Sequence, residues 1–321
     1  MIQEINPKFI FIGTPEFGAI VLEKLAENNL KPVLVVTAPS KPVGRKQIVT
    51  PPPVKVAAEK HKIPVLQPKK IKDIEPRLKE LNPDLIFVSA YGQILPKGIL
   101  DIPKYGCLNL HPSLLPRWRG ASPIQFTILS GDRTAGATII LMDEKVDHGP
   151  IVASLEFEIS NLEIKYKELE SLLANVGAEL FIENISRWLA GEIEAREQDE
   201  DKTTYSIILK KDDGRIDWTK SAQEIARQVR AFGSWPGSFC YWPENGKKIR
   251  IKILETNILP QTNNGPFGIK GKTFQAPNNR IAVQTGKDFL VIEKLQPEGK
   301  NSQKAEDFLR GHPDFIGTIL E

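Results

Sequence analysis

The stretch KFIFIGTPEFGAIVLEKLAENN, residues 8–29, joins two hydrophobic patterns that together indicate the fold. Residues 8–13 form an almost uninterrupted apolar run, as in a strand that is buried on both faces. From Glu16 onward the apolar residues recur at helical spacing. The stretch therefore predicts a buried strand followed by an amphipathic helix, the unit from which parallel sheets are built.

The same alternation of strand-like and helix-like segments continues to about residue 190. Strands are expected at 32–38, 63–68, 83–90, 106–111 and 136–143, and helices at 54–62, 121–131 and 163–191, the last as one helix or a broken pair. This predicts an α/β fold with a doubly wound, mostly parallel, Rossmann-like sheet. Ligands bind such sheets beyond the carboxyl ends of the strands. The expected positions of the site are Gly13, 89–92, 109–111 and 143–147.

After residue 190 the pattern changes. Residues 191–207 are polar and charged, which is typical of a linker. A helical stretch at 221–232 is then followed by short strand-like runs spaced by Gly, Pro and Asn, which predict a smaller, OB-like β-barrel. We therefore expect a catalytic domain at 1–190, a linker at 191–207 and a C-terminal β-barrel domain at 208–321.

The composition excludes several classes of protein. The 321-residue chain is 40% hydrophobic and 26% charged, as is ordinary for a globular protein. It has neither an apolar run of about 18 residues nor a signal-peptide pattern, so we expect no membrane span and a cytoplasmic location. Its two cysteines cannot form a disulfide framework. From residue 205 onward the sequence has 18 Lys and Arg but 13 Asp and Glu. This excess of positive charge favours a polyanionic partner, although an ordinary solvated surface could have the same composition.

One expected strand carries the residues best suited to chemistry. Alternate residues of a strand share a face, so Asn109 and His111 point the same way at the ligand-binding edge. Histidine moves protons near neutral pH, and asparagine can donate to a developing oxyanion. A carboxylate would orient the imidazole, and the next strand leads to Asp143, Glu144 and Asp147. The alternative is a histidine that only caps a strand end, beside acidic residues that form a turn.

Other kinds of site fit the sequence poorly. Cys107 and His111 lie about 13 Å apart along a strand and cannot easily share a metal ion. The chain has no CxxC, HxH or HExxH pattern, so no metal is expected. The turn at 11–18 lacks the GxGxxG spacing, which argues against NAD, and neither a P-loop nor a GxSxG elbow is present.

Eight stretches carry longer motifs: FIGTPEFG, TAPSKPVGR, AYGQILP, NLHPSLLPRWRGASP, MDEKVDHGPI, TTYSIILKKDDGRIDW, RAFGSWPG and LQPEGK. In order and spacing, over almost the whole chain, they resemble the methionyl-tRNA formyltransferase family. The NxHxSLLPxxRG motif with a downstream Asp marks the wider folate-dependent formyltransferase superfamily, whereas the last two stretches are more specific to the two-domain tRNA enzymes.

The resemblance implies transfer of a formyl group from 10-formyltetrahydrofolate to the α-amino group of methionyl initiator tRNA, for translation initiation. It implies a catalytic trio of Asn109, His111 and Asp147. Asn109 would donate to the oxyanion, His111 would be a cationic stabiliser or proton shuttle, and Asp147 would hold His111 and a bridging water. The residues implied to bind folate are Gln93, Leu95, Ser113, Leu114, Leu115, Pro116, Asp143, Glu144 and Val146.

The residues implied to bind tRNA are cationic. Residues 38–53 read as a long, Pro-rich, irregular loop, which in the family enters the acceptor end of the tRNA. The expected contacts are Lys41, Arg45, Lys46, Arg117, Arg119, Lys210 and Lys211. Each of these could instead be a solvated cation or a salt-bridge partner. His148 departs from the family, in which small residues or Thr are more common, and we expect it to face solvent.

The main alternative is a sugar-nucleotide N-formyltransferase that shares the trio and the folate. The cationic loop and the C-terminal motifs favour tRNA over a sugar. A non-catalytic RNA-binding protein is disfavoured by the intact trio, and a dehydrogenase by the missing glycine fingerprint. We expect a monomer, because the sequence has no heptad and no exposed apolar repeat.

Overall fold

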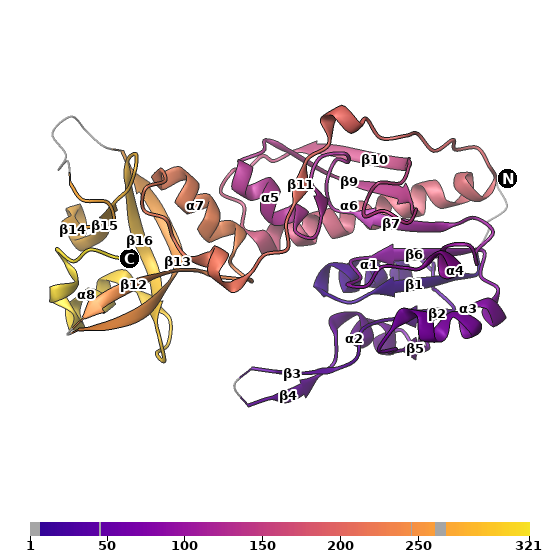
Figure 1. Cartoon of the computed structure of the whole chain (residues 1–321), viewed down its shortest axis with the longest axis horizontal. Helices are drawn as coiled ribbons and strands as arrows, with labels where there is room; N and C mark the ends of the chain where they lie inside the picture. Colours follow the sequence, from indigo (N-terminus) through magenta and orange to yellow (C-terminus); the bar gives the residue numbers. More distant parts are fainter. Residues whose placement is uncertain (1–6, 45, 245, 261–267) are drawn as a thin grey trace. The chain divides into compact units, whose positions relative to one another are not determined.

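Figure 1 shows the computed structural model of the chain, which describes residues 7–44, 46–244, 246–260 and 268–321. The chain divides into two compact units. The first unit extends to Pro123 and includes Thr134–Glu158 and Leu169–Ser206, and the second contains Ile124–Arg133, Ile159–Glu168 and Ile207–Glu321. No helix of the described residues is long and apolar enough to cross a membrane.

The first unit is built on a seven-stranded sheet of order β10-β9-β7-β6-β1-β2-β5. Its strands are β1 (Phe9–Gly13), β2 (Leu34–Val36), β5 (Val65–Leu66), β6 (Leu85–Ser89), β7 (Cys107–His111), β9 (Thr134–Leu141) and β10 (Ile151–Glu158). All neighbouring strands from β7 to β5 pair in parallel, and β9 runs antiparallel to both β7 and β10. The predicted mostly parallel sheet is confirmed.

Helices and apolar side chains cover both faces of this sheet. The helices are α1 (Glu16–Glu27), α2 (Pro53–Lys60), α3 (Glu75–Leu81), α4 (Lys97–Leu100) and α6 (Tyr166–Leu189). On one face Phe181 of α6 stacks on Phe87 of β6, with 3.8 Å between the ring centroids. On the other, Ile10 and Ile12 of β1 pack in a cluster with Leu78. Burial on both faces explains why β1 and β6 are buried at every position, as their apolar runs predict.

Residues 38–53 and strand β10 are among the segments of this unit that differ from the prediction. Residues 38–53, predicted as an irregular loop, contain an exposed hairpin in which β3 (Lys41–Val43) pairs antiparallel with β4 (Ile48–Thr50). The hairpin was not predicted because proline is unfavourable inside most strands. Pro42 nevertheless lies within β3, which is possible because β3 is an edge strand. Strand β10 was not expected, because its exposed positions alternate with less exposed ones and interrupt any apolar run.

The second unit contains an antiparallel sheet that curls into a half-barrel, the small β-domain that the sequence predicts. Its strands are β12 (Ser238–Glu244), β13 (Lys247–Leu259), β14 (Thr273–Ala276), β15 (Arg280–Gln284), β16 (Phe289–Pro297) and β17 (Gln303–Lys304). Its helices include α5 (Pro123–Ser130), α7 (Ala222–Ala231) and α8 (Ala305–Gly311). Register shifts between Ile253 and Thr256 interrupt the β13–β16 ladder, as bulges that bend strands do.

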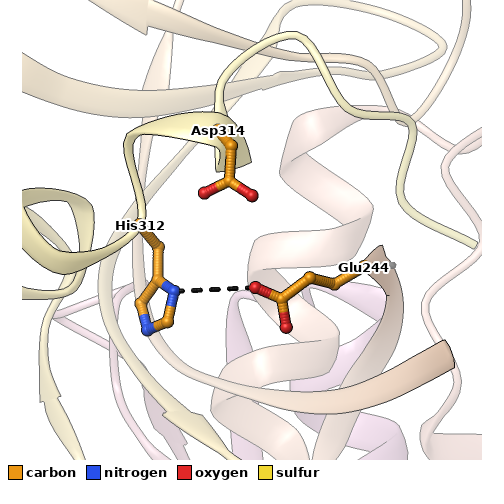
Figure 2. A group of neighbouring side chains, drawn as sticks. All are labelled: Glu244, His312 and Asp314. Atoms are coloured by element: carbon orange, nitrogen blue, oxygen red, sulfur yellow. Dashed lines mark ion pairs between the residues drawn. The ribbon is translucent and has the colours of Figure 1, made fainter. Parts of the chain in front are cut away.

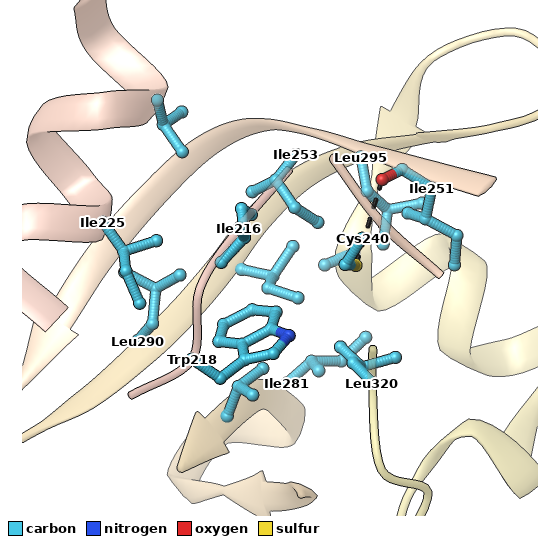
Figure 3. Packing of buried hydrophobic residues seen from close by; sticks show 14 of the residues in the cluster. Ile216, Trp218, Ile225, Cys240, Ile251, Ile253, Ile281, Leu290, Leu295 and Leu320 are labelled. Atoms are coloured by element: carbon cyan, nitrogen blue, oxygen red, sulfur yellow. Dashed lines mark hydrogen bonds between the residues drawn. The ribbon is translucent and has the colours of Figure 1, made fainter. Parts of the chain in front are cut away.

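The core of the second unit lies between the curled sheet and its helices (Figure 3). Trp218, Ile225 of α7 and Cys240 of β12 are among its buried members. A capping box starts α7, since Ser221 Oγ accepts from the Glu224 amide and the Glu224 carboxylate accepts from the Ser221 amide. The helix thus begins at a defined residue and turns its apolar face to the sheet.

Candidate active site

Three polar side chains meet at the carboxyl end of β7. Asn109 and His111 lie on one face of this strand, and Asp147 lies on the loop between β9 and β10. Asp147 Oδ1 is 3.5 Å from Asn109 Nδ2 and 3.6 Å from His111 Nδ1. The His111 and Asp147 side chains are only 6% and 14% exposed. The amide, the imidazole and the carboxylate therefore face one another where water is largely excluded.

Both ring nitrogens of His111 face an acceptor. Nε2 lies 2.9 Å from the Trp118 carbonyl oxygen, which can only accept, so Nε2 carries a proton. Nδ1 faces Asp147 Oδ1, so that a second proton, on Nδ1, also finds an acceptor. The other carboxylate oxygen of Asp147, Oδ2, accepts from the Gly120 amide at 2.8 Å. The hydrogen bond to Trp118 holds the ring from one side, and Nδ1, 3.6 Å from Asp147 Oδ1, is the atom that can exchange a proton with a substrate.

The loop that follows β7 is held by its own side chains. Ser113 Oγ donates to the Arg117 carbonyl at 2.6 Å. Thr138 Oγ1 of β9 donates to the Ser113 carbonyl at 2.7 Å and accepts from the Leu115 amide at 3.1 Å. Ser113 and Leu115 are buried, whereas Leu114 and Pro116 are partly exposed. These hydrogen bonds therefore fix the shape of the loop that carries the Trp118 carbonyl.

The loop that carries Asp147 contains a second His–carboxylate pair. Asp143 accepts from the Lys145 amide at 2.8 Å and lies 2.6 Å from His148 Nδ1. The His148 side chain is 29% exposed, so it is partly open to solvent, and the prediction that it faces solvent holds only in part. The Asp143 carboxylate, earlier in the same turn, also holds its ring. Glu144 and Val146 are exposed in this loop.

Neither of the predicted residues of the segment after β6, Gln93 and Leu95, is exposed. Gln93 Oε1 accepts from the Ile71 amide at 2.9 Å, and its Nε2 donates to the Lys69 carbonyl. Leu95 is 2% exposed and packs in the core cluster of the first unit. Ile94, which the sequence reasoning missed, is 73% exposed. Ile94 rather than Leu95 is thus the residue that faces outward.

The predicted tRNA ligands lie in three places. Lys41 and Lys46 are exposed on or beside the β3–β4 hairpin, and Arg45 lies outside the described residues. Lys210 and Lys211 are exposed in the second unit. The Arg117 guanidinium is 4.3 Å from the centre of the Trp118 ring.

Arg119 does not fit the predicted role as a tRNA ligand. It is 2% exposed, and its guanidinium donates to Gln198 at 2.9 and 3.0 Å and to Glu200 at 2.6 Å. Protein acceptors therefore occupy the donors that a phosphate would need. The sequence shows that residue 119 is a cation, but it does not show that the Arg119 side chain is buried.

Side chains that could together hold a metal ion form a single group among the described residues. Cys107 is buried, and burial raises the pKa of its thiol to about 12. The one group of three candidate ligands among the described residues is Glu244, His312 and Asp314, in the second unit (Figure 2). His312 Nδ1 and Glu244 Oε1 lie 3.8 Å apart, and Asp314 is exposed. This arrangement is a surface ion pair with an acidic neighbour, from which we infer no metal site.

Comparison with known proteins identifies the class to which this fold and site belong. The model of the formyl transferase family matches residues 7–185, and that of the formyl transferase C-terminal domain matches residues 208–313. Among solved structures, HypX from Aquifex aeolicus in complex with tetrahydrofolic acid has a TM-score of 0.63 at 15% identity, over 97% of this chain and 47% of that chain. The sugar 3N-formyl transferase WlaRD has a TM-score of 0.59 at 18% identity, over 92% of this chain and 99% of that chain. Likeness at these identities shows the fold alone.

Sequence relatives identify the particular family. The methionyl-tRNA formyltransferase of Bacillus velezensis is 42% identical over 317 residues, 98% of this chain and 97% of that protein. That of Bacillus subtilis is 39% identical over 317 residues, with the same coverage. The chain belongs to the methionyl-tRNA formyltransferase family, as its motifs predicted.

Proposed function

We propose that the chain transfers the formyl group of 10-formyltetrahydrofolate to the α-amino group of methionyl initiator tRNA. The observation that carries the proposal is the convergence of Asn109, His111 and Asp147 at one edge of a formyl transferase sheet. The sugar-nucleotide alternative is supported only by structural neighbours of 18–21% identity.

Each member of the trio has a role that its position allows. Asn109 Nδ2 can donate to the formyl oxygen as negative charge develops on it during attack by the amine. His111 Nδ1 can stabilise that charge and move the proton that the amine must lose. Asp147 Oδ1 lies beside both groups and keeps the ring oriented toward the substrate. The folate supplies the formyl group: the bond from the formyl carbon to the folate nitrogen breaks, that nitrogen takes up the proton that the amine loses, and tetrahydrofolate leaves.

We place the folate beside the trio, against the loops that the sequence indicates. Ile94 and Val146 are 73% and 59% exposed, and such apolar side chains can cover the faces of a flat pterin ring. Polar groups for the edge of the ring are available on the loop 143–147. Segment 113–116 supports this site by fixing the conformation of the loop after β7.

Two surfaces have the chemistry to bind tRNA. The β3–β4 hairpin presents Lys41 and Lys46 together with exposed Val43, Ile48 and Val49. Its mixture of cations and apolar side chains suits the phosphates and bases at an opened acceptor end.

The second surface is a hollow of about 500 Å³ in the second unit. Lys211, Arg250, Lys252 and Trp235 line it. Trp235 is 53% exposed, and Arg250 stacks on the Phe239 ring with 3.8 Å to its centre. Within the described part of the chain, none of these three cations has an acidic partner within 4 Å. Unpaired cations beside an exposed aromatic ring fit an RNA backbone and a stacked base.

Formyl transfer from 10-formyltetrahydrofolate tests the proposed function directly. Charged initiator tRNA is expected to be formylated rapidly, whereas charged elongator methionine tRNA and a UDP-amino-sugar are expected to remain unmodified. Transfer to the sugar but to neither tRNA would assign the alternative function. No transfer to any acceptor by folded protein would refute both.

The hollow makes its own prediction about tRNA binding. The double variant Lys211→Gln/Lys252→Gln is expected to raise the KM for tRNA several-fold, with kcat little changed. Each lost phosphate contact should also lower the slope of log affinity against log salt by about 0.9. Salt-dependent binding measurements check this. Lys287→Gln, a lysine of the same unit that does not line the hollow, is the control. An unchanged KM and slope in the double variant would contradict this tRNA surface.

A further inference from the structure

Gln198 lies in the segment between the two family matches, which end at residue 185 and begin at 208. Up to Ser206 the segment nevertheless belongs to the first unit. Strand β11 (Tyr205–Ser206) pairs with β8 (Arg119–Gly120), and Arg196 exchanges backbone hydrogen bonds with Ile151. What the sequence presents as a linker is therefore bonded to the loops that form the site.

Both ends of the Gln198 side chain are fully used. Its Nε2 donates to the carbonyl oxygens of Asp147 and Gly149 at 2.9 and 2.8 Å. Its Oε1 accepts two hydrogen bonds from the Arg119 guanidinium. Gln198 is 8% exposed. A single amide thus joins the turn that carries Asp147 to a buried cation.

The orientation of this amide follows from its partners. A guanidinium can only donate and a carbonyl oxygen can only accept, so Oε1 must face Arg119 and Nε2 must face the turn. Glu200 in turn accepts from both terminal nitrogens of Arg119, at 2.6 and 3.1 Å. The hydrogen bonds that link Glu200, Arg119 and Gln198 therefore allow only one orientation of the Gln198 amide.

The turn that Gln198 holds needs such support. Asp147 has φ of 50°, in the left-handed region, which is unfavourable for a residue with a Cβ atom. This conformation directs the Asp147 carboxylate to the Gly120 amide and to His111. The carbonyls of Asp147 and Gly149 turn inward in the same loop and require donors. Gln198 supplies both donors at once.

We propose that Gln198 is a positioning residue for formyl transfer: without touching the substrate, it holds Asp147 in the left-handed conformation in which its carboxylate orients His111. The inference rests on the proposed function of the trio. Its distinctive feature is that the whole effect passes through Asp147.

Gln198→Glu is the sharpest variant, because it keeps the size of the side chain and an acceptor for Arg119 but removes both donors to the turn. We expect kcat to fall about 10–100-fold, as is typical for loss of a supporting hydrogen bond, with KM for the acceptor within about twofold. Gln198→Met, which has similar volume and no charge, should show the same loss. Gln275→Glu, an exposed glutamine of the second unit, is the matched control. Unchanged kcat in both folded Gln198 variants would overturn the proposal.

Coupling to Asp147 separates positioning from a general structural effect. In an Asp147→Asn background, Gln198→Glu should change kcat less than about twofold, because residues that act through one group are not additive. A full second loss would overturn the proposal.

A crystal structure of Gln198→Glu gives a readout that does not depend on the acceptor. The Asp147 carboxylate should lose its 2.8 Å contact with the Gly120 amide. Retention of that contact would overturn the positioning role even if the tRNA assay succeeds, whereas its loss in a protein that formylates no tRNA would refute only the proposed substrate.

Discussion

His111→Ala is expected to lower kcat by about 10²–10⁴-fold and to change the KM values little, because it removes the ring nitrogen that we propose moves a proton in the transition state. Single-turnover formylation of charged initiator tRNA measures the effect. His111 is 4% exposed and its Nε2 donates to the Trp118 carbonyl, so the folding of the variant must be checked by thermal melting.

A second substitution separates the chemistry from the support of the loop. His111→Gln can keep a donor for the Trp118 carbonyl but offers no group that exchanges protons near neutral pH. It is expected to melt closer to the parent protein and yet to lose as much activity as His111→Ala. His61→Ala, at the C-terminal end of α2, is the control. If a folded His111 variant turned over at a near-normal rate, the proposed role of the imidazole would be wrong.

The sequence predicts part of this site because part of it follows from local periodicity. The two-residue repeat of a strand is enough to place Asn109 and His111 on one face, and the apolar runs are enough to place that face at the edge of a parallel sheet. Both inferences use residues that are close in the chain. They needed no knowledge of which segments meet in space.

The choice among Asp143, Glu144 and Asp147 did not follow from the residues in the same way. All three lie in one turn, and the turn determines where each carboxylate points. In the structure Asp143 is paired with His148, Glu144 is exposed, and Asp147 adopts the left-handed conformation that directs it to His111. The carbonyl of Asp147 accepts a hydrogen bond from Gln198, 51 residues away in the sequence. Only the resemblance to a family selected Asp147 in advance.

The burial of polar residues is the feature of the site that the sequence consistently failed to predict. Gln198 lies in a charged stretch that is interpreted from the sequence as a linker, and Arg119 is interpreted as a phosphate ligand. The periodicity of a sequence indicates which apolar residues are buried. It does not indicate which polar groups are buried and hydrogen-bonded to a distant partner. Their mutual hydrogen bonds join residues 79 positions apart. A contact of this kind appears only once the chain is folded.

Gly149→Ala is expected to be the most damaging small substitution in the loop between β9 and β10, which carries Asp147. An added Cβ would lie 1.8 Å from the Leu141 carbonyl oxygen and 2.9 Å from its carbon, so the backbone itself must move. The Gly149 carbonyl accepts from Gln198, and Asp147 is two residues away, so the displacement reaches the carboxylate that orients His111. A misplacement of about 1 Å costs about 10²-fold in rate, and forced overpacking costs about 1–3 kcal/mol of stability. We therefore expect kcat to fall at least about 100-fold and Tm to fall as well.

The comparison with Gly311→Ala isolates the cause. Gly311 ends α8, and a Cβ there would meet no described atom within 4 Å. Alanine is the better helix former by about 1 kcal/mol, so this variant should be neutral or slightly more stable and fully active. Kinetics measured well below the melting temperature of Gly149→Ala distinguish a displaced carboxylate from partial unfolding. Full activity in Gly149→Ala would mean that Leu141 and the loop can separate without moving Asp147, and that close contact with β9 does not fix the catalytic turn.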